Sequence, residues 1–149
     1  MKFILLVLIL AIIAAVYLYI ENHFILVKRH KDFGGDVKIL HISDCHKRNN
    51  STYNKRILSA AQQEKPDLIF ITGDFVSRTE TDFSLCEAFF HGLCEIAPVY
   101  LCMGNHEQSF IHDNQQEFLD AMHRTKAEIL MNSGRHVKKK GREFYICGV

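Results

Sequence analysis

The chain has 149 residues and a formal net charge of +1, with 48% hydrophobic and 23% charged residues. This apolar content excludes an intrinsically disordered protein, and the length suffices for one ordinary domain. The balanced charge gives no basic field of the kind that binds nucleic acid, so we expect no nucleic-acid partner. The five cysteines are odd in number and have no Cys-x-x-Cys spacing, which favours thiols over a disulfide framework.

The first predicted element is an apolar helix at the N-terminus. The run from Phe3 to Ile20 carries no charge and just reaches the length of about 18 residues that is typical of a membrane-spanning helix. Tyr17 and Tyr19 lie near its far end, where aromatic side chains favour a membrane interface. We therefore predict a transmembrane anchor over residues 1–21. The alternatives are a cleaved signal peptide, which needs a small-x-small cleavage site, and a core helix, which usually has a polar stripe.

Basic residues flank this anchor on both sides. Lys2 precedes it, whereas Lys28, Arg29 and Lys31 follow it within a juxtamembrane connector predicted over residues 22–36. The positive-inside rule favours a single-pass protein of the cell membrane whose remaining chain lies in the cytoplasm. A signal-anchor arrangement with that part outside the cell is the alternative.

Beyond the connector, strand and helix patterns alternate. Short apolar runs predict strands, and apolar residues at a 3.6-residue period predict helices. This alternation predicts an α/β fold in which right-handed crossovers connect parallel strands. The predicted elements are, in chain order, strand Val37–Ile42, helix 52–64, strand Leu68–Thr72, helix 82–96, strand Val99–Met103, helix 114–126, strand 129–131, a hairpin turn at 138–141 and strand 144–149.

Three polar blocks directly follow the first three of these strands. They are Asp44-Cys45-His46, Gly73-Asp74 and Gly104-Asn105-His106-Glu107. Because parallel strands end at the same edge of a sheet, where open α/β sheets place their ligands, we expect the blocks to meet there. Two carboxylates, two imidazoles and an amide suit a divalent metal. Taken singly, each residue is also typical of an ordinary turn or loop, so the joint pattern carries this interpretation.

These blocks resemble the Asp-x-His, Gly-Asp and Gly-Asn-His-Asp/Glu motifs of the calcineurin-like metallophosphoesterases, in the same order. The membrane-anchored bacterial phosphodiesterase-like branch is the most similar. The resemblance covers residues 37–149. It implies the N-terminal part of a metallophosphoesterase-type α/β sandwich, because the family's later histidine motifs, an isolated His and a Gly-His-x-His block, do not occur in the sequence.

The resemblance also implies two divalent metal ions, with Mn, Fe and Zn as candidates. Asp44 and His46 would hold the first ion, Asn105 the second, and Asp74 would bridge the two. His106 would be catalytic, stabilising the transferred phosphorus or protonating the departing alkoxide, while a metal-bound hydroxide attacks.

Three further residues would support this site. Glu107 would orient the neighbouring imidazole or contact the backbone. Gly73 and Gly104 would permit sharp turns near the ions.

The function implied is hydrolysis of a phosphodiester or phosphomonoester, and the anchor favours a lipid-linked substrate. Two alternatives stay open: an inactive or partner-dependent fragment, and a membrane-anchored binding module on the same scaffold. In the first, a C-terminal half or a partner chain supplies the missing histidine ligands. Ligand counting predicts that this chain alone binds two metals poorly.

Overall fold

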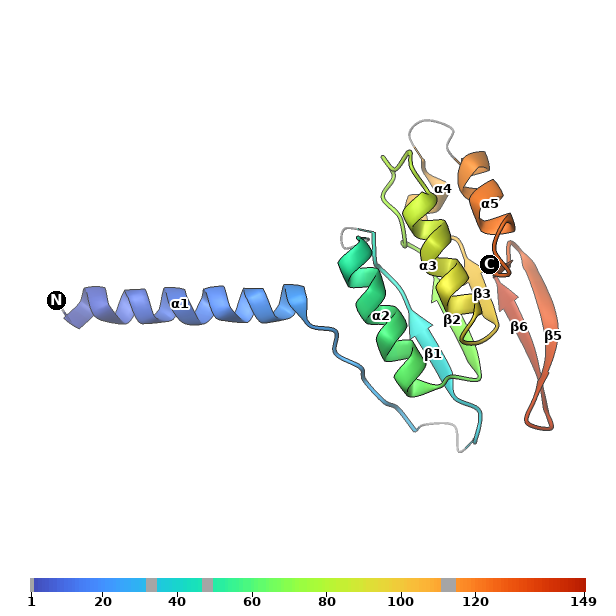
Figure 1. Ribbon diagram of the computed structural model, residues 1–149, viewed down its shortest axis with the longest axis horizontal. Coiled ribbons are helices and arrows are strands. Elements are labelled where there is room, and N and C mark those ends of the chain that lie inside the picture. The colour runs from blue at the N-terminus through green and yellow to red at the C-terminus, as the bar shows by residue number, and fades with distance from the viewer. Residues whose placement is uncertain (1, 32–34, 47–49, 111–114) are drawn as a thin grey trace. The chain divides into compact units, whose positions relative to one another are not determined.

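The structure is a computed structural model that describes residues 2–31, 35–46, 50–110 and 115–149 (Figure 1). The chain divides into two compact units, residues 1–30 and 31–149. The division falls within the predicted connector, and the predicted boundaries 1–21, 22–36 and 37–149 stay predictions.

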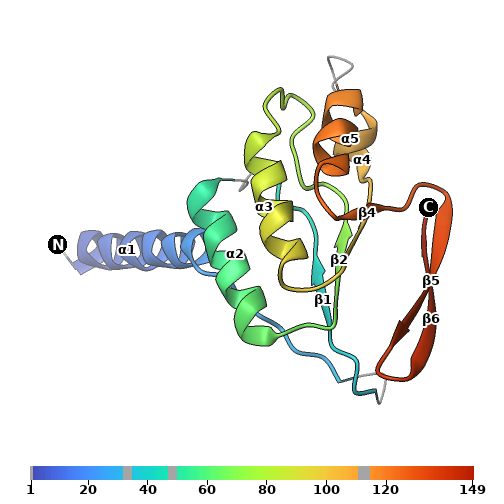
Figure 2. The same cartoon turned by 45° about the vertical axis from the view of Figure 1, so that its right-hand side comes forward.

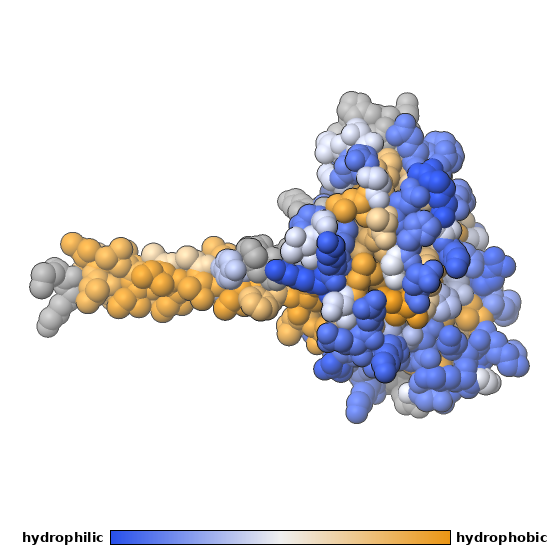
Figure 3. Space-filling view, in the orientation of Figure 1, coloured by the Kyte–Doolittle hydropathy of each residue, from blue (hydrophilic) through white to orange (hydrophobic). Residues whose placement is uncertain are grey.

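The first unit consists of helix α1, Lys2–His23, and the segment after it. Its 18-residue stretch Phe3–Ile20 has a mean hydropathy of 3.1, and none of that stretch is buried. The helix surface in view is apolar along its length (Figure 3). A helix that is apolar all round has no polar side to turn towards water. By length and composition, α1 is therefore able to cross a membrane.

The second unit is built on a parallel sheet of four strands in the order β1-β2-β3-β4. The register places Ile42 of β1 beside Ile71 of β2, and Ile71 beside Leu101 of β3. The α/β prediction is confirmed. The strands are β1 Ile39–Ile42, β2 Leu68–Thr72, β3 Val99–Cys102 and β4 Glu128–Ile129.

The connecting helices lie side by side over one face of this sheet (Figures 1 and 2). They are α2 Ser51–Glu64, α3 Ser84–Cys94 and α5 Gln115–His123, whereas the single turn α4, Asn105–Gln108, follows β3 at the carboxyl edge of the sheet. Because the strand order advances in one direction and crossovers share one hand, successive helices fall on the same side. The buried core between the two layers includes Ile57, Ala61, Ile69, Ile71, Phe90, Leu93, Leu101 and Met122.

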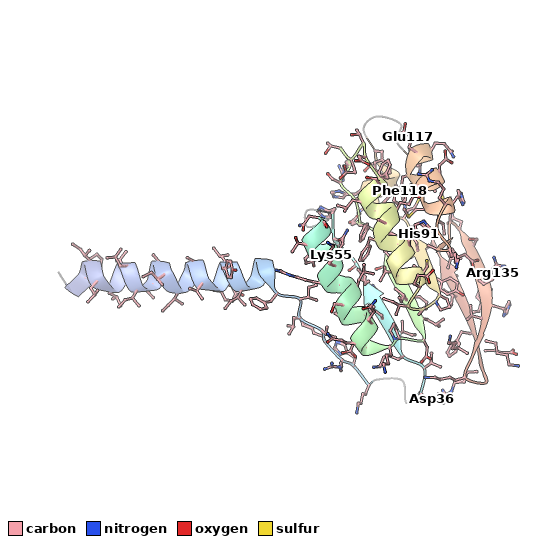
Figure 4. All side chains as sticks on the ribbon, viewed as in Figure 1. Asp36, Lys55, His91, Glu117, Phe118 and Arg135 are labelled. Atoms are coloured by element: carbon pink, nitrogen blue, oxygen red, sulfur yellow. The ribbon has the colours of Figure 1, made fainter. Side chains whose placement is uncertain are left out.

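Local capping sets the ends of these helices. Asn50 accepts a hydrogen bond from the backbone N–H of Tyr53 at 2.9 Å and starts α2, and Lys65 in a left-handed conformation ends it. Helix α3 begins at Ser84 rather than at the predicted residue 82, because Asp82 accepts from the N–H of Ser84 at 2.9 Å and so lies outside the helix. On α5, Phe118 is fully buried whereas Glu117 is exposed (Figure 4).

The chain continues into an antiparallel hairpin of β5, Ser133–Lys139, and β6, Arg142–Gly148. Lys140 and Gly141 form the turn with φ of 49° and 75°, as two-residue hairpin turns require. A hairpin turn was predicted at 138–141; the structure has the turn at residues 140 and 141, because 138 and 139 pair with β6 as the end of β5. Lys140 Nζ contacts Asp67 Oδ2 at 2.6 Å and the Asp36 carbonyl at 2.9 Å, which holds the hairpin tip beside the start of the sheet.

Candidate functional site

The loops after β1, β2 and β3 meet at the carboxyl edge of the sheet. The N–H of Asp44 donates to the carbonyl of Gly73 at 3.3 Å, and the N–H of His46 donates to the carbonyl of Asp74 at 3.0 Å. The N–H of His106 donates to Oδ1 of the Asp74 side chain at 2.9 Å. Asp74 is therefore the residue to which both other loops are joined.

Both aspartates of this edge have an unusual backbone. Asp44 has a φ of 57° and Asp74 a φ of 53°, in the left-handed region that few residues other than glycine adopt. Such conformations cost on the order of 1 kcal/mol or more and cluster at functional sites, where the surroundings impose them. Gly73, directly before Asp74, has a φ of 82°.

Gly73 and Gly104 allow the second and third loops to approach one another. A Cβ atom on Gly104 would overlap the amide nitrogen and Oδ1 of Asp74, and one on Gly73 would overlap the Gly104 backbone. Both positions therefore require glycine because of the space available, independently of the turn geometry.

Glu107 is fully buried beneath these loops. Its Oε1 accepts from the N–H groups of Phe75 at 2.6 Å and Val76 at 3.0 Å, and its Oε2 accepts from Asp74 at 2.8 Å and Gly104 at 2.9 Å. The carboxylate thus spans the second and third loops through backbone amides.

The imidazoles of His46 and His106 stack against each other, with ring centroids 4.1 Å apart and planes inclined by 24°. The Nδ1 atom of His106 is buried and has no hydrogen-bond partner among the described residues. An unpartnered buried polar atom is costly, because burial removes its hydrogen bonds to water. The two rings and the Asp74 carboxylate therefore form the polar centre of the edge.

The other two predicted ligands are more peripheral. Asp44 and Asn105, the first residue of α4, are both exposed. Among the residues that the structure describes, no three His, Cys, Asp or Glu side chains are grouped so as to hold a metal ion. The donor types fit a divalent cation, but they are not assembled into a coordination sphere. The metal-ligand roles of Asp44, His46, Asp74 and Asn105 and the catalytic role of His106 stay predictions.

Cys45 lies between two predicted ligands yet points into the core, where it is 3% exposed. Burial raises the pKa of the neighbouring Cys86 thiol well above its ordinary value, and the charge of Glu107 adds to this effect. Both thiols therefore belong to the apolar layer beneath the loops.

Sequence reasoning did not single out the Phe75 and Val76 amides, which are half of the Glu107 contacts. Backbone groups carry no residue-specific signature, so the motif Gly-Asp offered no signal for them. The buried acid itself was recognisable from its place in the third block.

Residues 37–146 match the family model described as calcineurin-like phosphoesterase, and the chain belongs to this family. The resemblance drawn from the three motifs is thereby confirmed. The chain is also similar to "Phosphodiesterase YaeI" of Escherichia coli (strain K12), with 25% identity over 127 residues. That match covers 79% of this chain and 45% of the relative, so the chain spans less than half of the relative's length.

Proposed function

We propose that this chain carries part of the active site of a metal-dependent phosphodiesterase or phosphatase. The observation that carries the proposal is the convergence of three sequence-distant loops on Asp74. The family generally uses divalent metals, and the donor set at this edge is of the corresponding kind. Asp44, His46 and Asn105 would hold two such ions, which Asp74 would bridge, and the ions would supply Lewis-acid activation of the phosphoester and of water.

His106 is the proposed acid of the reaction. Its imidazole lies over that of His46, and its Nδ1 has no partner among the described residues. A histidine of this kind is suited to donate a proton to the departing alkoxide or to contact the phosphoryl oxygens. Neutralising the developing alkoxide lowers the barrier to breaking the P–O bond.

We place the substrate at a membrane. Helix α1 is apolar over Phe3–Ile20 and exposed throughout, which supports a single-pass anchor. The basic residues Lys28, Arg29 and Lys31 after it favour a cytoplasmic active site. An anchored hydrolase meets lipid-linked phosphoesters at high local concentration, so a phosphoester on a lipid is the proposed substrate class.

A second candidate is a partner-dependent fragment. It is favoured by the lack of a three-donor metal group among the described residues. In this form the remaining imidazole ligands come from a C-terminal half or from a partner chain. The DNA sequence beyond codon 149 distinguishes a C-terminal half from a partner chain. An in-frame Gly-His-x-His block supports one polypeptide, and a stop codon supports a separate partner.

The test is metal analysis and hydrolysis of bis-p-nitrophenyl phosphate by the natural gene product with added Mn²⁺. We expect Asp74→Ala to abolish turnover and Asp120→Ala, at an exposed position on α5, to leave it unchanged. The 149-residue chain alone should show weak Mn²⁺ binding and little turnover. Turnover that survives Asp74→Ala or complete chelation of metal would overturn the proposed function.

A further inference from the structure

We propose that Glu107 is the positioning residue of this site: its buried carboxylate sets the backbone geometry of Asp74 before any ligand binds. The importance of Glu107 for the reaction rests on the proposed function. Its effect on the backbone of Asp74 is inferred from the contacts of Glu107 alone.

The contacts exceed what a helix cap requires. Glu107 is the third residue of α4, and an acid at this position normally bonds the N–H of the residue before the helix, here Gly104. Its other three amide partners lie 31 to 33 residues away, in the loop after β2. Most of its hydrogen bonding is therefore directed across the two loops.

The arrangement fixes Asp74 from both sides. Glu107 Oε2 holds the amide of Asp74, and Oε1 holds the amide of Phe75, so the peptide groups before and after the Asp74 Cα are both held. Two fixed peptide planes determine φ and ψ of the residue between them, here in the left-handed region. The N–H of His106 then orients the Asp74 carboxylate itself.

The chemistry requires a carboxylate. Each oxygen accepts two N–H groups, and an ionised carboxylate offers acceptor sites only. A glutamine of the same size must place its NH₂ group on one side. It then faces either the buried Phe75 and Val76 amides or the part-buried Asp74 and Gly104 amides, so two donors lose their acceptor in either orientation.

The test compares the full chain with Glu107→Gln and with Glu95→Gln, an exposed acid on the same chain. Residue-resolved amide hydrogen exchange is measured without metal. The Mn²⁺ affinity is measured in a separate experiment, on the natural gene product and its Glu107→Gln variant, from the signal of free Mn²⁺. We expect Glu107→Gln to speed exchange at least tenfold at two or more of the four amides that Glu107 holds. The amides of Ile71 and Leu101 in the sheet should keep their rates. Mn²⁺ binding should weaken about 10- to 100-fold, as is usual when a supporting contact of a metal ligand is lost.

The inference is overturned if those four amides exchange in Glu107→Gln as they do in the wild type. A uniform loss of protection that includes Ile71 and Leu101 also overturns it, because Glu107 would then stabilise the fold without a specific effect on the loops. If Glu107→Gln does not fold, hydrogen exchange of the wild-type protein tests the inference instead. We then expect the four amides that Glu107 holds to exchange at least tenfold more slowly than the amide of the exposed residue Arg78. Equal exchange rates would refute the inference. A wild-type natural gene product that takes up no Mn²⁺ contradicts the proposed function, while the exchange result still decides on Glu107.

Discussion

The N–H of His106 donates to Oδ1 of Asp74 at 2.9 Å, although the two residues lie 32 positions apart in the chain. This bond joins the loop after β2 to the first turn of α4 after β3. One oxygen of Asp74 is thereby oriented by the protein, and a carboxylate retains further lone pairs for a ligand. Contacts of this kind between loops determine the geometry of the edge. Two glycine substitutions can therefore distinguish the effect of a Cβ atom that has no room from the effect of a strained backbone conformation.

Gly104→Ala and Gly141→Ala form one such pair. Gly104 has an ordinary φ of −89° but no room for a Cβ atom beside Asp74, whereas Gly141 has open space and a φ of 75°. We expect Gly104→Ala to destabilise the fold by about 1–3 kcal/mol through overpacking and to shift the amide resonances of Asp74 and His106. Gly141→Ala should cost about 1 kcal/mol through its left-handed backbone and leave those resonances in place.

The measurements for this pair are thermal unfolding by far-ultraviolet circular dichroism and amide NMR spectra of the chain in detergent. Unchanged resonances of Asp74 in Gly104→Ala would show that the close approach of the two loops is not maintained in solution.

The contact between Asp67 and Lys140 predicts a pH-dependent stability. The hydrogen bond from Lys140, helped by the N–H of Lys38, lowers the pKa of Asp67 below its ordinary value of 3.8. A carboxyl group whose pKa is lower in the folded state stabilises the fold above its unfolded pKa and loses that effect as the pH falls through the folded pKa. We expect Asp67→Asn to unfold about 3–5 °C below the wild type near neutral pH, in line with a contribution of about 1 kcal/mol.

This difference should shrink once the pH falls below 3.8. Thermal unfolding at several pH values measures it, and Lys140→Ala is the partner control, since Asp67→Asn should have a smaller effect in its background. A difference that is the same at low and neutral pH would contradict the assignment of the effect to Asp67.

The cysteines should differ sharply in reactivity. Cys86 is 1% exposed, and its burial raises the pKa of its thiol well above the ordinary value, whereas Cys147 on β6 is exposed. Only the thiolate form is nucleophilic, so we expect iodoacetamide to label Cys147 in the native chain and to leave Cys86 and Cys45 unmodified. Peptide mass spectrometry before and after denaturation measures the labelling. Rapid labelling of Cys86 under native conditions would mean that the layer beneath the loops opens readily.

The membrane role of α1 can be tested by charge. Ile9→Arg combined with Ile13→Arg places two cations in the middle of the apolar run, at a cost of about 5 kcal/mol or more for membrane insertion. We expect the double variant to be extracted from membranes by alkaline carbonate, and the matched pair Ile9→Leu and Ile13→Leu to stay in the membrane fraction. Equal retention of both variants would argue against a lipid-embedded helix.

The sheet could be predicted from the sequence because its strands are continuous apolar runs. Leu68–Thr72 agrees with the prediction at both ends, and β1 and β3 are shorter than predicted by two residues and one residue. Strand β5 was not predicted because Ser133–Lys139 is polar and has no apolar alternation, so that only its pairing with β6 defines it. Helix α5 ends at His123 rather than at residue 126. The hydroxyl of Thr125 donates to the carbonyl of Met122 and so caps the C-terminal end of the helix. Residue 114, the predicted start of that helix, lies outside the described residues.

The candidate site could be predicted in its residues but not in its internal contacts. The three blocks are recognisable from residue types and from their place after strands. Helix α4, by contrast, is a single turn whose acid bonds mainly to amides far away in sequence, and no local pattern indicates such a partner. The stacked arrangement of His46 and His106 likewise depends on how two loops meet.

The polar edge is assembled from segments that follow three different strands, so it exists only when all three strands are in register. A ligand that binds there binds only the folded state, so by mass action it raises the unfolding temperature of the domain that contains the sheet. A ligand at a concentration of one hundred times its dissociation constant would raise the free energy of unfolding by about 2.7 kcal/mol. A thermal-shift screen of cations and phosphate esters would therefore report occupancy even when no turnover occurs.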